Sequence, residues 1–138
     1  MIRVVVDTIV FNSSFFGGNS RKVIDLWRSG EVILCLSKPV INEYIEVLHR
    51  LGLQDEKEID QLLSLFAHGL HVVFTAKTPE LKIVEKDPDD DMFIECAVVL
   101  KAEFVITGDK ALKTIQEYMR TKIVSPNEFL NYFRRLKR

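Results

Sequence analysis

Short, nearly continuous apolar runs, mostly of β-branched residues, alternate along the chain with segments whose apolar residues recur at helical spacing. Such runs occupy residues 2–6, 32–36, 72–74, 104–106 and 122–124. A continuous apolar run of this length is typical of a strand buried on both faces of a parallel sheet. Strands that alternate with helices favour an α/β class. We therefore expect a three-layer α/β/α sandwich with a central, mostly parallel sheet.

Helix boundaries are marked by capping residues. Ser37 followed by a proline predicts the start of a helix over residues 37–51, and Ser125-Pro126-Asn127-Glu128 has the form of a capping box that starts the C-terminal helix. A further helix is expected over about residues 55–68. The nearly all-apolar segment 92–101 predicts a helix that is buried or lies in a subunit interface.

Length and composition predict one folded domain over residues 1–138. The chain is 47% hydrophobic and 28% charged, and a domain of this size buries enough surface to fold without disulfide or metal staples. Cys35 and Cys96 lie in apolar runs without Cys-x-x-Cys spacing, so we expect reduced core residues. No apolar run approaches the ~20 residues of a membrane span and the N-terminus lacks signal-peptide form, which predicts a soluble, cytoplasmic protein without membrane contact.

Charge is distributed unevenly although the net charge is only −1. Residues 1–109 carry 11 Lys/Arg and 18 Asp/Glu, whereas residues 110–138 carry 8 and 2. An acidic body with a basic end can hold a cation in one place and a polyanion beside it. The alternative is that the basic end is a solvated tail.

Acidic residues follow the predicted strands. Asp7 directly follows the first strand, and Asp109 follows the 104–106 strand after two residues. Parallel strands bring such positions to one sheet edge, where α/β folds place their sites. Glu43 lies beside the apolar stripe of the 37–51 helix, where a charge is costly unless it is compensated.

A second acidic group, Asp87-Pro88-Asp89-Asp90-Asp91, opens the apolar helix. Asp90 shares a helix face with Ile94 and Ala97, whereas Asp91 shares one with Glu95, so Asp90 is the better candidate to face inward. These acids have structural alternatives: favourable charges at a helix N-terminus, an N-cap at Asp109, or a surface glutamate at Glu43.

Several converging carboxylates repel one another unless they bind a proton or share a cation. Mg²⁺ or Mn²⁺ suits such a site because these ions prefer oxygen ligands and bridge to phosphate oxygens. Other chemistries lack their signatures: Gly17-Gly18 lacks the Lys-Ser/Thr of a P-loop, no histidine has metal-ligand spacing with a carboxylate, and no Ser-His-Asp pattern is evident.

Four segments in this order resemble the PIN-domain family, in particular small VapC-like proteins described as toxin components of prokaryotic toxin–antitoxin pairs. They are Val4-Val5-Val6-Asp7-Thr8, Ser37-Lys38-Pro39-Val40-Ile41-Asn42-Glu43, Asp87-Pro88-Asp89-Asp90-Asp91-Met92-Phe93 and Val105-Ile106-Thr107-Gly108-Asp109. The resemblance covers essentially the whole chain.

The resemblance implies a metal-dependent endoribonuclease in which Mg²⁺ or Mn²⁺ directs a water at an RNA phosphodiester. The acids implied are Asp7, Glu43, Asp90 or Asp91, and Asp109, with Asp7, Glu43, Asp90 and Asp109 as the metal ligands. Thr8 and Thr107 are expected to orient the neighbouring carboxylates, and Lys110 and the basic end to contact phosphates. The implied protein partners are an antitoxin and further copies of the chain in a homodimer or higher homo-oligomer.

Ile9 departs from the family pattern, which has Asp-Thr-Asn where this chain has Asp-Thr-Ile. The missing amide removes a hydrogen-bonding group near Asp7. A catalytically weakened module that binds RNA or a partner protein without cleavage is therefore the alternative function. A haloacid-dehalogenase-like phosphatase is excluded, since it needs an acid where Ile9 stands.

Overall fold

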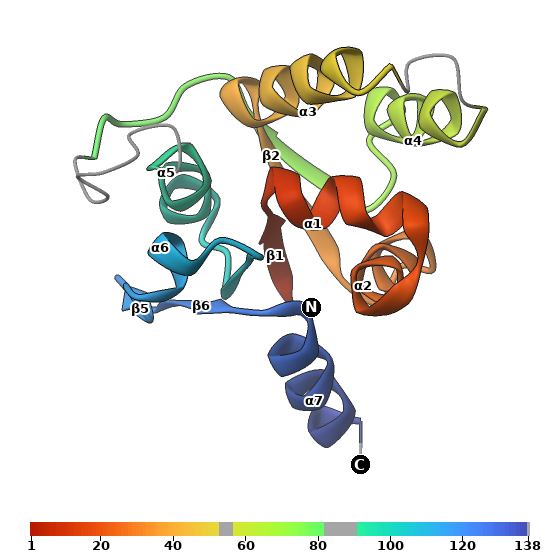
Figure 1. Ribbon diagram of the computed structural model, residues 1–138. Coiled ribbons are helices and arrows are strands. Elements are labelled where there is room, and N and C mark those ends of the chain that lie inside the picture. The colour runs from red at the N-terminus through yellow and green to blue at the C-terminus, as the bar shows by residue number, and fades with distance from the viewer. Residues whose placement is uncertain (53–56, 82–90, 138) are drawn as a thin grey trace.

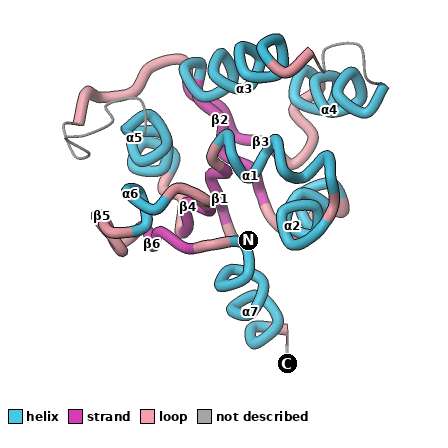
Figure 2. Tube along the Cα trace, in the orientation of Figure 1, coloured by secondary structure: helices cyan, strands magenta, loops and turns pink. Residues whose placement is uncertain are grey.

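The computed structural model describes residues 1–52, 57–81 and 91–137, and its central element is a six-stranded sheet (Figures 1 and 2). The strand order is β3-β2-β1-β4-β6-β5. All neighbouring strands are parallel except β5, which is antiparallel to β6. The strands are β1 (Arg3–Val6), β2 (Ile33–Ser37), β3 (Val72–Thr75), β4 (Phe104–Ile106), β5 (Glu117–Tyr118) and β6 (Thr121–Val124).

Helices cover both faces of this sheet, so the α/β/α prediction is confirmed. In Figure 1, α1 and α2 lie on one side of β1 and α5 on the other, and α5 contacts β1, β2, β3 and β4. The helices are α1 (Thr8–Ser13), α2 (Gly18–Arg28), α3 (Lys38–Arg50), α4 (Lys57–Ala67), α5 (Asp91–Leu100), α6 (Lys110–Lys113) and α7 (Pro126–Leu136), with a 3₁₀ turn, η1 (Ser14–Phe16), after α1.

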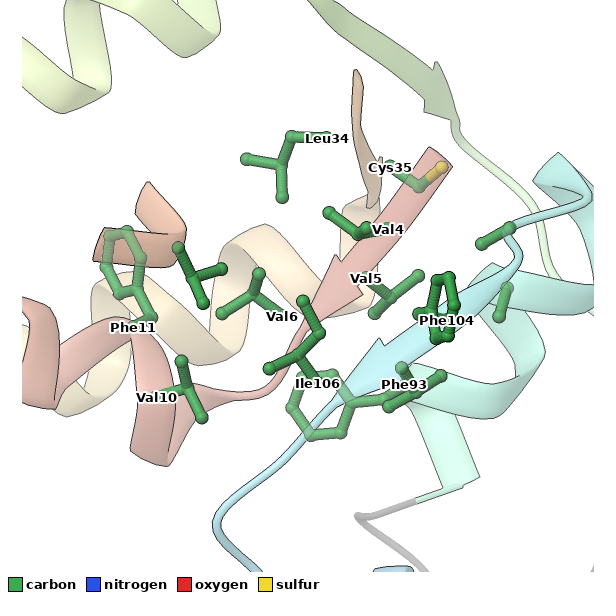
Figure 3. Close-up of a cluster of buried hydrophobic side chains, with 14 of the residues drawn as sticks. Val4, Val5, Val6, Val10, Phe11, Leu34, Cys35, Phe93, Phe104 and Ile106 are labelled. Atoms are coloured by element: carbon green, nitrogen blue, oxygen red, sulfur yellow. The ribbon is translucent and has the colours of Figure 1, made fainter. Parts of the chain in front are cut away.

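The core lies on both faces of β1. Val4, Val5 and Val6 are at most 1% exposed, as expected for a strand between two helical layers. Figure 3 shows Phe11 of α1 on one side of this strand and Phe93 of α5 on the other. Because helices pack against both faces of β1, the end of this strand is held in place. The residue that follows the strand is therefore held in place as well.

Two predicted helix starts are confirmed. The Ser37 hydroxyl accepts a hydrogen bond from Val40 N at 3.3 Å at the start of α3. At the start of α7, Ser125 and Glu128 exchange both bonds of a capping box. These caps are local in sequence, which explains why they are readable without a structure.

Three elements were not predicted from the sequence. α1 and η1 together span only residues 8–16, too short for helical periodicity to be recognised, and α1 is stabilised by its N-cap Asp7 and by burial of Val10 and Phe11. The two-residue strand β5 pairs with β6 in a hairpin whose turn residues Met119 and Arg120 have positive φ, without the glycine that usually marks such turns.

Cys35 and Cys96 are buried and free, as predicted. Burial raises the pKa of each thiol to about 12, so both remain protonated at neutral pH. Among the helices that the structure describes, none has the length and apolar character that a membrane span requires.

Candidate active site

Asp7 and Asp109 lie at the edge of the sheet where the strand order reverses. The chain passes from β1 to β2 and β3 on one side and then crosses to β4 on the other side of β1. Asp7 follows β1 and Asp109 follows β4, the two strands that flank this switch point. In open α/β sheets, the crevice beyond the carboxyl ends of such strands is the usual place for a site.

Asp7 is a buried carboxylate, with 2% exposure, that accepts three hydrogen bonds. Its Oδ1 accepts from Val10 N at 2.8 Å, which caps α1. Its Oδ2 accepts from the Thr107 hydroxyl and from Gly108 N at 3.1 Å. Burial raises the pKa of Asp7; these three bonds lower it, and the nearby charge of Asp109 raises it further, with a raised pKa as the net result.

Thr107 connects the two acids. Its hydroxyl donates to Asp7 Oδ2 and accepts from Asp109 N at 2.9 Å. Asp109 in turn caps α6, because its Oδ1 accepts from Ala111 N at 2.8 Å and from Leu112 N at 3.4 Å. The N-cap expected as a structural alternative for Asp109 is therefore present, but both of these bonds go to Oδ1, so capping does not use Oδ2.

Oxygen atoms at this edge retain capacity to bind a cation. A carboxylate offers about four lone-pair positions, and Asp7 uses three of them in the bonds described above. Beside it, Thr8 Oγ1 is buried without a hydrogen-bond partner among the described residues. An unsatisfied buried hydroxyl is costly, and a ligand, ion or water at this position would relieve that cost.

Glu43 lies half-buried on α3, whose position is fixed relative to the end of β1. The next residue, Tyr44, is fully buried and donates its hydroxyl hydrogen bond to the carbonyl of Val6, the residue before Asp7. The Tyr44 ring also stacks on Phe11 of α1, with ring centroids 4.2 Å apart. α3 is thus attached both to the strand and to the helix that flank Asp7.

Asp91 is buried, with 6% exposure, in the first turn of α5. The sequence pattern favoured Asp90 as the inward acid, and Asp90 lies outside the described residues, as do Asp87 and Asp89. One turn further along α5, Glu95 Oε2 accepts from Leu81 N at 2.6 Å. Burial raises the pKa of Glu95, the Leu81 bond lowers it, and the charges of Asp91 and Glu80 raise it, so these acids interact.

Glu95 was not singled out from the sequence, although its i+4 relation to Asp91 is a usable signal. Within residues 1–52, 57–81 and 91–137, no three Asp, Glu, His or Cys side chains form a group that could hold a metal ion. What the described residues do bring together is the pair Asp7 and Asp109, joined by Thr107.

Ile9 and Lys110 lie on the solvent side of this pair. Ile9 is 50% exposed, and a Cβ built on Gly108 would lie 2.9 Å from Ile9 Cγ2, so the isoleucine lies against the Thr107–Asp109 loop. Lys110, predicted to contact phosphates, is exposed on the first residue of α6. The site therefore combines the buried Asp7 and the half-buried Asp109 with an apolar and a basic side chain at its rim.

A family model described as a PIN domain matches residues 3–111. The match extends from β1 to the start of α6, so it includes Asp7, Glu43, Asp91 and Asp109 and leaves out β5, β6 and α7. No curated protein matches the chain.

Proposed function

The chain belongs to the PIN-domain family, and from that premise we propose that it is a metal-dependent ribonuclease that hydrolyses RNA phosphodiester bonds with a metal-activated water. PIN domains are generally metal-dependent nucleases. The single observation that carries the proposal is the pair Asp7 and Asp109, joined through Thr107 at the switch point of the sheet.

The residues present fit Mg²⁺ or Mn²⁺. The donors are oxygen atoms, which these ions prefer. Burial raises the pKa of Asp7, and a cation beside this carboxylate would lower it and favour the ionised form. We assign Asp7 and Asp109 as ligands, with Glu43 and either Asp90 or Asp91 completing the set. When bound, the ion would lower the pKa of a bound water and stabilise negative charge on the phosphate.

The chain's own residues hold the reacting groups in position. Thr107 and Gly108 N hold Asp7 Oδ2, so that carboxylate has a fixed orientation before any ligand arrives. The N-cap bonds hold Asp109 Oδ1 in the same way. Lys110 binds the RNA backbone, where neutralising phosphates gives affinity without sequence selectivity. The basic end of α7, also expected to contact phosphates, lies at the opposite edge of the sheet, where Lys137 pairs with Glu31 ahead of β2.

The test is cleavage of a labelled RNA pool that contains single-stranded and structured segments, with Mn²⁺, with Mg²⁺ and with EDTA. We expect metal-dependent cleavage by the wild type and its loss in Asp7→Asn and in Asp109→Asn. Asp60→Asn, at an exposed acid on α4, is the matched control and should cleave normally. Cleavage that persists in Asp7→Asn would come from a contaminating nuclease and would contradict the proposal.

Calorimetric titration with Mn²⁺ tests the metal site independently of activity. Asp7→Asn and Asp109→Asn should weaken Mn²⁺ binding by at least about tenfold, the loss typical for supporting or ligating groups. Asp90→Asn and Asp91→Asn, measured side by side, identify the fourth ligand. Equal and negligible losses in both would mean that neither is a ligand.

The biological role we propose is that of the toxin in a toxin–antitoxin pair, supported by the resemblance to small VapC-like proteins. The antitoxin would block the site by inserting a basic residue among the acids, since a cation there competes directly with the metal. Induced expression in bacteria should arrest growth for the wild type and not for Asp7→Asn. Failure of the neighbouring gene product to co-purify with the chain would count against this role.

A binding module without cleavage is the second candidate, and the half-exposed Ile9 at the rim of the site favours it. RNA binding without cleavage in either metal, by wild type and by Ile9→Asn alike, would establish this candidate. Restored cleavage in Ile9→Asn would instead show that the site is intact and that only Ile9 weakens it. Sedimentation of the same samples tests the proposed homo-oligomer.

A further inference from the structure

A groove of about 420 Å³ lies between α2 and α7, two helices that pack against each other. We call it the α2–α7 groove. It is lined by the apolar Leu26, Leu130 and Phe133 and by the charged Lys22, Arg134 and Lys137. α7 lies outside residues 3–111, which match the PIN-domain model, so half of this groove comes from a part of the chain that the family match leaves out.

Apolar side chains form the floor of the α2–α7 groove. Leu130 is 6% exposed, and Leu26 and Phe133 are half-buried. Leu136 follows Phe133 by three residues, which places it on the same side of α7, and it is 53% exposed. The apolar side of α7 is therefore only partly covered within the molecule, and its burial against a partner would be favourable.

The rim of the groove carries an excess of positive charge. Lys22 and Arg134 are exposed, and within residues 1–52, 57–81 and 91–137 neither forms an ion pair with a carboxylate. Arg134 Nη1 donates to the neutral amide oxygen of Asn131 at 3.4 Å. Lys137 differs, because its Nζ lies 2.6 Å from Glu31 Oε1. The rim therefore offers two positive groups to an acidic ligand.

The lining suits a peptide better than a nucleic acid. A base needs an open ring face on which to stack. The Phe133 ring has Lys137 Nζ 5.5 Å from its centroid and the Phe129 ring beside it, with the two centroids 6.1 Å apart. Aliphatic side chains have no such requirement, because their packing on apolar groups is not directional. The cations of the rim then favour carboxylates in the same ligand.

The shape of the groove favours a helical ligand. α2 and α7 have 11 residues each, so each is about 16 Å long. Two packed helices leave a groove in which the side chains of a third helix interdigitate. An amphipathic helix presents apolar residues to such a groove at every third or fourth position.

We propose that the α2–α7 groove binds an acidic amphipathic helix of a partner protein. The apolar side of that helix lies on Leu26, Leu130 and Phe133, and its carboxylates pair with Lys22 and Arg134. The complementary charge of the rim and the uncovered apolar side of α7 are the two observations that support this occupant.

The proposed partner binds away from the acid pair. The groove reaches Glu31, ahead of β2, whereas Asp7 and Asp109 lie beyond the carboxyl ends of β1 and β4 at the opposite edge of the sheet. A helix in the groove therefore leaves the acids open, unlike a partner that blocks the site. The inference does not depend on the proposed ribonuclease function.

The test measures binding of a labelled synthetic peptide to the full-length chain by fluorescence anisotropy. The peptide forms a helix of three to four turns, with leucines on one side and glutamates flanking them. A second peptide has lysines in place of the glutamates, and a third has serines in place of the leucines. The variants are Lys22→Glu and Arg134→Glu. Lys57→Glu, at an exposed lysine on α4, is the matched control.

We expect saturable binding of the leucine–glutamate peptide to the wild type. Lys22→Glu and Arg134→Glu should each weaken it by about fivefold, the upper range for one exposed ion pair, and Lys57→Glu should bind like the wild type. The variant with both changes should prefer the lysine peptide. The serine peptide should bind at least about tenfold more weakly than the leucine peptide, because it has no apolar side to bury.

Four outcomes overturn the proposal. The first is the absence of saturable binding by the wild type up to about 1 mM peptide. The second is equal weakening by Lys57→Glu, or equal affinity for the serine peptide, because binding is then diffuse. The third is RNA binding that Lys22→Glu and Arg134→Glu weaken while the peptide does not bind, which assigns the groove to RNA. The fourth is a wild-type dimer that Arg134→Glu dissociates in sedimentation, which assigns it to a second copy of the chain.

Discussion

The Thr107 hydroxyl donates a hydrogen bond to Asp7 Oδ2, across 100 residues of sequence, and accepts one from Asp109 N at 2.9 Å. One buried side chain therefore sets the orientation of the first acid and the backbone position of the second. Both acids also cap helices, Asp7 at α1 and Asp109 at α6. The hydrogen bonds that form these caps therefore also hold in place the carboxylates that we propose as metal ligands.

Thr107→Val removes this link while keeping the shape of the side chain. We expect the free energy of unfolding to fall by about 1–3 kcal/mol, because a buried carboxylate and a backbone N–H each lose a partner. Mn²⁺ binding should weaken by about 10–100-fold. Urea unfolding and calorimetry measure the two effects.

Thr121→Val is the matched control for this change. Thr121 is also buried, and its hydroxyl donates to the carbonyl of Ala102 at 2.7 Å, away from the acids. It should lose comparable stability and keep wild-type affinity for Mn²⁺. An equal loss of metal affinity in both variants would contradict a specific role for Thr107.

The stability of the metal-free protein should depend on the protonation of Asp7. Burial raises the pKa of Asp7 in the folded state above its ordinary 3.8. The folded state therefore binds the Asp7 proton more tightly than the unfolded state does. The resulting contribution to the free energy of unfolding is complete at pH values below the pKa of Asp7 in the unfolded state, and it is lost as the pH rises through the pKa in the folded state. Asp7→Asn has no proton to lose.

In EDTA, the melting temperature of Asp7→Asn should therefore rise relative to that of the wild type as the pH increases from about 4 to 7. Added Mn²⁺ at pH 7 should raise the melting temperature of the wild type and not of the variant, because only the wild type binds the ion tightly. A difference between the two proteins that stays constant over this pH range would refute the linkage.

Gly108→Ala should destabilise the protein through Ile9. The added Cβ would lie 2.9 Å from Ile9 Cγ2 and 3.6 Å from Ile9 Cβ. A β-branched side chain has little freedom at χ1 to move aside, so we expect a loss of about 1–3 kcal/mol. Ile9→Ala combined with Gly108→Ala should recover most of it, and a double-mutant cycle by urea unfolding measures the coupling. Additive effects would mean that the two residues do not touch.

Tyr44→Phe removes the hydroxyl that binds the Val6 carbonyl and keeps the ring stacked on Phe11. We expect a loss of about 1–2 kcal/mol in unfolding free energy and a lower kcat, because α3 carries Glu43 and is attached to β1 through this bond. Tyr132→Phe, at a half-buried tyrosine on α7, is the control and should change neither quantity appreciably. Unchanged stability in Tyr44→Phe would show that the bond contributes nothing.

Lys110→Ala tests the contact with phosphate. RNA binding should weaken at every sequence tested, and the slope of log affinity against log salt concentration should fall by about one. Lys101→Ala, an exposed lysine after α5 at the opposite edge of the sheet, should leave the slope unchanged. If both variants lower the slope equally, binding is diffuse and Lys110 has no special place in it.

The sequence alone determined the fold class, five of the six strands and the positions of Asp7 and Asp109 after two of them. These properties are readable because they depend on local patterns: continuous apolar runs predict buried strands, and a residue that directly follows a strand lies at its carboxyl end. The caps at Ser37 and Ser125 were readable for the same reason, since their bonds span three residues.

Only the tertiary structure decided how these acids are held and what surrounds them. The Thr107 link, the burial of Asp91, the contact of Ile9 with Gly108 and the attachment of Tyr44 to Val6 join segments far apart in the chain. Such contacts depend on which strands become neighbours, which local patterns do not determine. α1 is the clearest case, since a six-residue helix is unstable by itself and forms here because Asp7 caps it and the sheet buries Val10 and Phe11.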